Sequence, residues 1–147
     1  MTIREQAEYH RLLLAMGIIC REDVIAWADQ LLLQSTVPVQ VIDVSLAVQA
    51  SLRQLDALLE RVPGEGDLAL AAHAALGRFK LVLHDMPLNA AVQKIVAYGN
   101  TARVPEQENN DAVVFRVFYE DMLAGHGEGG GKLWRMLHDF VNQHAHA

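Results

Sequence analysis

The chain has 147 residues, of which 52% are hydrophobic and 20% are charged. This size and balance are typical of one globular domain with its own core, and they exclude a disordered chain or a small disulfide-dependent scaffold. The 12 basic and 18 acidic side chains give a formal net charge of −6. Because such a surface repels phosphate backbones, we expect no nucleic-acid partner.

Cysteine content and hydropathy predict where the protein resides. Cys20 is the only cysteine, so no intramolecular disulfide can form, which fits a reducing compartment. Charges at Arg4, Glu5 and Glu8 interrupt the basic-then-apolar order of a signal peptide. The longest uncharged apolar run in mid-chain, residues 68–77, is shorter than the roughly 20 residues that a bilayer requires. We therefore expect a cytoplasmic protein with no membrane partner.

Helix signals begin at the first residues of the chain. Thr2 and Glu5 have the spacing of a capping box, and Gly17 stands where a C-terminal cap belongs. A second helix is predicted from Arg21, because acids in its first turn complement the helix dipole. Its apolar side chains then recur at helical spacing at Val24, Ile25, Ala28, Leu31 and Leu32.

The segment after Pro38 has two interpretations over residues 38–47. Its β-branched side chains suit a short strand, but no second strand candidate is convincing as a partner. The helical interpretation is favoured because apolar residues recur in steps of three and four, with one further member seven residues upstream. These residues are Val41, Val48, Leu52, Leu55, Leu59 and Val62.

The second half of the chain also predicts helices joined by turns. Asp67 can cap a helix over residues 68–85, which is apolar around most of its circumference and is expected in the middle of a bundle. Pro87 ends that helix. A shorter helix ends near Gly99, a polar loop covers residues 101–111, two helices follow, and residues 144–147 are expected to fray. The predicted fold is all-α, a single compact domain over residues 1–147 with an array or bundle of about seven helices.

The glycine-rich stretch AGHGEGGGKLW at residues 124–134 raises the question of a phosphate-binding loop. Gly131 and Lys132 would close such a loop, but His126 stands where its first glycine belongs. Leu133 also lacks the hydroxyl that holds magnesium, and the expected preceding strand is a helix here. We interpret residues 124–131 as a hinge between helices.

Spacing alone predicts neither a metal site, nor a cofactor site, nor a catalytic site. His73 and His84 fall on nearly the same helix face, but they are about 16 Å apart along the axis, too far to share a zinc ion. His138 and His144 point to opposite sides of their helix. We expect these histidines to be solvated or packed, and Cys20 to be a small buried hydrophobe.

Two hypotheses for function remain. The preferred one is a non-enzymatic protein–protein interaction module of the adaptor, regulator or toxin-neutralising type, whose partner is another protein or a second copy in a homodimer. Its contact residues would be the surplus apolar Trp27 and Leu33 and the loop acids Glu106, Glu108 and Asp111.

The alternative is a small helical enzyme or a ligand- or metal-binding protein with a site between helices. Its candidate residues are His73 and His84, joined by Cys20. The preferred hypothesis requires that the polar side chains make the helical scaffold soluble and do not converge on a reacting molecule. Two imidazoles and an acid meeting in the fold would contradict it.

Overall fold

The computed structural model describes residues 1–34, 36–125 and 129–145. Within these ranges the chain forms eight α-helices, one 3-10 helix and no strand, which confirms the all-α prediction. The helices are α1 Ile3–Ala15, α2 Arg21–Leu32, α3 Gln40–Ser45, α4 Leu52–Glu60, α5 Leu68–Val82, η1 Leu83–Asp85, α6 Leu88–Thr101, α7 Glu106–Leu123 and α8 Gly130–His144. No helix in the described ranges is both long and apolar enough to span a membrane.

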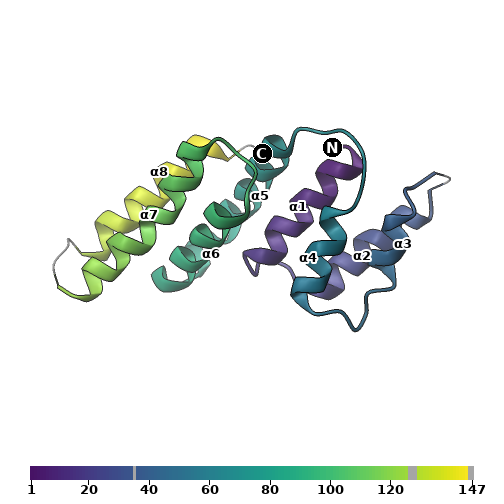
Figure 1. Ribbon diagram of the computed structural model, residues 1–147. Helices are drawn as coiled ribbons and strands as arrows, with labels where there is room; N and C mark the ends of the chain where they lie inside the picture. The colour runs from purple at the N-terminus through teal and green to yellow at the C-terminus, as the bar shows by residue number, and fades with distance from the viewer. Residues whose placement is uncertain (35, 126–128, 146–147) are drawn as a thin grey trace.

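The helices form an array with α1 at its centre. Helix α1 contacts α2 and α4 on one side and α5 and α6 on the other, while α7 and α8 pack at the far end of the array (Figure 1). The helix predicted over residues 68–85 forms α5 and η1, and α5 has neighbours on two sides, as its apolar sequence predicts, but it is not buried all round. Helix α5 contacts α1 and α8, and it leaves Leu81 65% exposed.

Two hydrophobic clusters explain why α1 is central. The smaller cluster joins α1 to α2, α3 and α4, and α1 contributes Ala7 and Leu14 to it. The larger cluster joins α1 to the helices from α5 to α8, and α1 contributes Leu12 and Leu13 to it. A helix that is apolar on opposite faces can be buried only between two neighbours. One compact domain with two adjoining cores results.

Several predicted helix ends are confirmed. The Thr2 side chain accepts a hydrogen bond from the Glu5 backbone N–H at 3.1 Å. In return, the Glu5 carboxylate accepts one from the Thr2 backbone N–H at 3.2 Å. Gly17 has a φ of 69°, a left-handed conformation that favours glycine after a helix. Asp67 caps α5 by accepting from the Leu70 N–H at 3.1 Å.

The segment over residues 38–62 differs from the continuous helical pattern that its spacing suggests. It forms the short helix α3 and the separate helix α4, so residues 40–45 are helical and the strand interpretation is wrong. Ser51 starts α4 through a capping box with Gln54. As a result Val48 and Leu52, which the periodic pattern places in the core, are 54% and 58% exposed.

The prediction of a polar loop over residues 101–111 is also wrong. Helix α6 extends to Thr101 and α7 begins at Glu106, so only residues 102–105 connect them. Pro105 precedes a first turn that carries Glu106 and Glu108, and acids are favoured at a helix N-terminus.

The glycine-rich segment and the C-terminal tail lie partly outside the described residues. Helix α7 ends at Leu123, and Gly125 has a φ of 77°. Helix α8 begins at Gly130, so residues 130–131 are helical and do not belong to the predicted hinge; residues 126–128 are not described. At the other end, α8 includes His144, which was predicted to fray, whereas residues 146–147 are not described.

Candidate metal centre

The buried carboxylate of Glu108 organises a polar cluster inside the helical array. Glu108 is 5% exposed, and a buried charge is costly unless polar groups surround it. The Tyr98 hydroxyl donates to Glu108 Oε1 at 2.6 Å. His73 Nε2 lies 3.0 Å from Oε1 and 2.9 Å from Oε2 of the same carboxylate. His144 Nδ1 lies 3.6 Å from Oε2.

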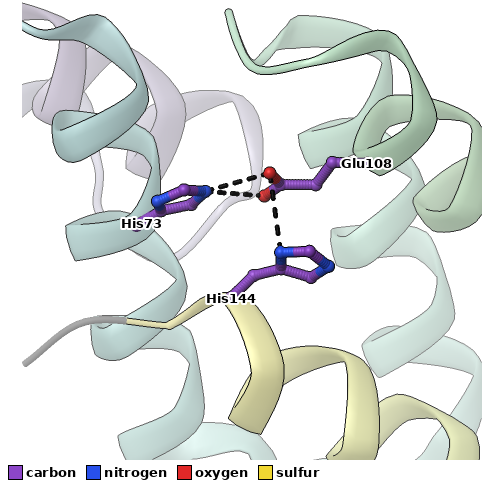
Figure 2. A group of neighbouring side chains, drawn as sticks. All are labelled: His73, Glu108 and His144. Carbon is purple, nitrogen blue, oxygen red and sulfur yellow. Dashed lines mark hydrogen bonds and ion pairs between the residues drawn. The ribbon is translucent and has the colours of Figure 1, made fainter.

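Three helices bring the imidazoles and the carboxylate together. His73 projects from α5, Glu108 from the first turn of α7 and His144 from the last turn of α8, and both rings point toward the carboxylate (Figure 2). The two imidazole rings stack with centroids 6.0 Å apart and an interplanar angle of 27°. The cluster therefore depends on the tertiary packing of α5, α7 and α8.

A close contact between α6 and α7 positions Glu108. Asn109 Nδ2 donates to the carbonyl oxygens of Gly99 at 2.8 Å and Ala102 at 2.9 Å, which fixes the start of α7 against the end of α6. Gly99 permits the approach, because a methyl group there would lie 2.8 Å from the Ala112 Cβ. The contact between the two helices thereby holds Glu108 within hydrogen-bonding distance of the Tyr98 hydroxyl.

The aromatic ring of Phe140 packs against two side chains of the cluster. The Phe140 ring lies 4.7 Å from the His144 ring and 6.4 Å from the Tyr98 ring, centroid to centroid. Burial, reinforced by the hydrogen bond to Glu108, raises the pKa of Tyr98 above its ordinary value. Tyr98 therefore stays protonated and acts as a hydrogen-bond donor to the carboxylate.

The donor atoms have the chemistry and spacing of metal ligands. One nitrogen from each of His73 and His144 and one oxygen from Glu108 lie within 4.8 Å of one another. Tetrahedral zinc with bonds of about 2.0–2.1 Å separates its ligands by about 3.3 Å, which falls between the 2.9 Å and 3.6 Å contacts of this cluster. Each imidazole side chain is 18% exposed, so solvent reaches the edge of the cluster.

The prediction that the histidines do not converge is wrong for His73 and His144. Sequence spacing misses these residues because the ligands come from separate helices, and His73 is 35 residues from Glu108 in the chain. No short metal-binding spacing exists between them. In addition, Glu108 was predicted to lie in a loop and His144 in a frayed tail.

The residues predicted to contact a partner lie in different environments. Leu33 is 80% exposed, and Glu106 and Asp111 are exposed on α7. Trp27 is half-buried, with its Nε1 donating to Gln6 Oε1 at 3.0 Å. Glu108 does not belong to an exposed docking surface, because its carboxylate faces His73 and Tyr98 inside the array.

The other residues of the alternative hypothesis do not join the cluster formed by the described residues. His84 lies in η1 with its side chain 70% exposed, 3.4 Å from Asp85. Cys20 is exposed, so the prediction of a buried thiol is wrong. Its Sγ donates to Asp23 Oδ2 at 3.1 Å, and this hydrogen bond raises the pKa of Cys20. Such a shift disfavours the thiolate that a nucleophile requires.

No protein-family model, curated protein or solved structure matches this chain.

Proposed function

We propose that this protein binds one divalent transition-metal ion of the zinc class through His73, Glu108 and His144. The observation that carries the proposal is the convergence of two imidazole nitrogens and a carboxylate oxygen at one point between α5, α7 and α8. Mixed nitrogen and oxygen donors favour zinc and its neighbours over magnesium or calcium, which prefer sites made of oxygen ligands alone.

Side chains around the ligands support this role. Tyr98 donates to one oxygen of Glu108, which orients the carboxylate in the way that outer-shell partners orient metal ligands. Phe140 packs against the His144 ring and restricts its position. The protein thus supplies ligands whose orientation is largely set before an ion arrives.

Ion binding would replace contacts that already exist within the cluster. In the structure His73 Nε2 faces both oxygens of Glu108, and a metal ion would substitute for that hydrogen bond. Ligating imidazoles must present an unprotonated nitrogen, so protons compete with the metal and affinity falls as pH is lowered. Three protein ligands leave a fourth position for water or another ligand, and a zinc ion there would act as a Lewis acid.

Calorimetric titration of the metal-free protein with zinc tests the proposal. We expect one site per chain, and each of the substitutions His73→Ala, Glu108→Gln and His144→Ala should weaken binding at least tenfold. His84→Ala is the matched control, because His84 is exposed and lies outside the cluster. Circular dichroism of every variant checks that the helices remain folded. Zinc binding that His84→Ala weakens as much as His73→Ala would overturn the proposal.

We also propose, as a second function, that an apolar surface on α2, α3 and their connecting segments mediates self-association. Its support is the exposure of large apolar side chains, with Leu33 at 80%, Leu46 at 73% and Val39 at 63%. Sedimentation velocity over a range of concentrations should show a dimer that Leu46→Glu converts to monomer. A wild-type protein that stays monomeric at high concentration would contradict this second function.

A further inference from the structure

A groove runs along α5 beside the candidate metal centre. Its volume is about 750 Å³, within the range of pockets that hold small organic ligands. Ala74 and Ala145, which line it, directly follow the ligand residues His73 and His144 in the chain. The described residues that line the groove are Met1, Tyr9, Ala74, Gly77, Arg78, Lys80, Leu81, His84 and Ala145.

The floor of the groove is apolar. Ala74, Gly77 and Leu81 are spaced three and four residues apart on α5, so they share one helix face. Tyr9 from α1 and Ala145 beyond α8 pack against the larger hydrophobic cluster and complete the floor. Because Leu81 is 65% exposed, an alkyl chain in the groove would remove apolar surface from water.

The rim of the groove is basic in a protein that is acidic overall. Arg78 and Lys80 are exposed on α5, and His84 follows them at the end of the groove. No Asp or Glu is among the described residues that line the groove, although Asp85 lies 3.4 Å from His84 and Asp23 is close enough to Arg78 to interact with it electrostatically. With a net charge of −6 for the chain, this local excess of positive charge favours an anionic ligand over a cationic one.

We infer that the groove binds a free medium-chain fatty carboxylate. The alkyl chain lies on Tyr9 and Leu81, the carboxylate pairs with Arg78, and Lys80 adds positive charge to the rim. A fatty carboxylate complements both the apolar floor and the basic rim. A hydrocarbon would complement the floor alone, and a small inorganic anion the rim alone. The inference goes beyond the metal site and does not depend on it, since none of the lining residues is a proposed metal ligand.

Calorimetric titration with sodium decanoate below its micelle concentration tests the inference. We expect one decanoate per chain, and at least tenfold weaker binding to the Arg78→Glu, Lys80→Glu double variant and to Leu81→Asp. Arg53→Glu and Leu52→Asp are matched controls, because both positions are exposed and lie outside the groove. These controls should bind decanoate within twofold of the wild-type protein.

Two further probes distinguish a free fatty carboxylate from a purely apolar ligand and from a lipid surface. Decyltrimethylammonium, which has the same chain and a positive head, should bind at least tenfold more weakly than decanoate. Equal binding of both, or no binding of decanoate, would overturn the inference, as would binding to phosphatidylglycerol vesicles without binding to decanoate. Glu108→Gln should lose zinc and keep decanoate, so failure of the metal site and failure of the groove are distinguishable.

Discussion

The Tyr98 hydroxyl lies 2.6 Å from Glu108 Oε1, and both side chains are buried between α6, α7 and α8. This contact links the end of α6 to the first turn of α7 at the position where His73 and His144 also reach the carboxylate. A buried carboxylate keeps its place only while donors surround it. The Tyr98–Glu108 hydrogen bond therefore connects the stability of the array to the geometry of the candidate metal centre.

Removing the Tyr98 hydroxyl tests its effect on the stability of the fold and its effect on metal binding. Tyr98→Phe leaves Glu108 Oε1 without its phenol donor, so the free energy of unfolding should fall by about 1–3 kcal/mol. Zinc affinity should fall about 10- to 100-fold, as is typical when an outer-shell partner is lost. Urea denaturation and calorimetry measure the two effects. Tyr119→Phe, at a half-buried tyrosine of α7 outside the cluster, should change neither, and equal effects of the two substitutions would contradict the assignment.

The close approach of α6 to α7 gives a second prediction. A methyl group on Gly99 would lie 2.8 Å from Ala112 Cβ and 2.9 Å from the Asn109 carbonyl oxygen, so Gly99→Ala must push the helices apart. We expect a loss of about 1–3 kcal/mol in the free energy of unfolding, the usual effect of overpacking. At Gly131, in the first turn of α8, an added methyl meets no described atom within 4 Å. Gly131→Ala should therefore leave stability unchanged or raise it, by up to about 1 kcal/mol.

Glu8 and Arg11 form a buried ion pair on α1. The Arg11 guanidinium donates to both carboxylate oxygens of Glu8, at 2.7 Å and 2.9 Å, and Glu8 is 0% exposed. Glu8→Ala removes this partner, while the guanidinium keeps the Thr101 carbonyl oxygen at 3.0 Å and the more exposed Asp56 and Glu60 at 3.4 Å. We therefore expect a loss of about 1.5–3 kcal/mol in the free energy of unfolding, measured by heat or urea.

The exposed pair between Arg21 and Glu22, 3.4 Å apart, provides the control for this prediction. Glu22→Ala should cost far less stability than Glu8→Ala, because solvent screens a surface ion pair. Comparable losses for Glu8→Ala and Glu22→Ala would show that burial does not set the contribution of the Glu8 pair.

His10 predicts a pH dependence of stability. Burial lowers the pKa of His10, and the hydrogen bond between its Nδ1 and the Gln6 carbonyl only partly offsets this. The unfolded chain therefore takes up the proton at a higher pH than the folded protein. The resulting stability is present above the ordinary histidine pKa of about 6.5 and is lost as pH falls through the folded value.

The free energy of unfolding in urea, measured at about pH 7.5 and at about pH 5, tests this dependence, because the two values lie on either side of the ordinary histidine pKa. His10→Phe retains an aromatic ring against Trp27, whose ring centroid lies 4.7 Å from that of His10, but it removes the titrating group. The variant should lose less stability than the wild-type protein at the lower pH. His84→Phe, at an exposed position, should follow the wild-type dependence, and a His10→Phe protein that does the same would refute the prediction.

Local signals predict much of the fold correctly. Thr2, Gly17 and Asp67 mark helix ends in the sequence because capping depends on residues only a few positions apart. The capping box of Ser51 and Gln54 carries the same kind of signal, and it divides residues 38–62 into two helices. Apolar periodicity alone misses that division, and it places the exposed Val48 and Leu52 in the core.

The candidate metal centre is not predictable from local signals. Its donors come from α5, α7 and α8, and no spacing rule relates residues that only tertiary packing brings together. Glu108 also resembles a solvated acid, because it lies in a polar stretch that includes Glu106 and Asp111. What distinguishes it is the approach of α6 at Gly99, which buries one side of the first turn of α7.

The most direct test of the proposed metal centre is a crystal structure of the zinc-loaded protein with anomalous data at the zinc edge. We predict one strong peak within about 2.0–2.2 Å of His73 Nε2, His144 Nδ1 and a Glu108 carboxylate oxygen. The peak should vanish in Glu108→Gln crystals grown and soaked in the same way. Zinc found only at surface histidines such as His84, with the His73–Glu108 hydrogen bond intact, would contradict the proposed metal centre.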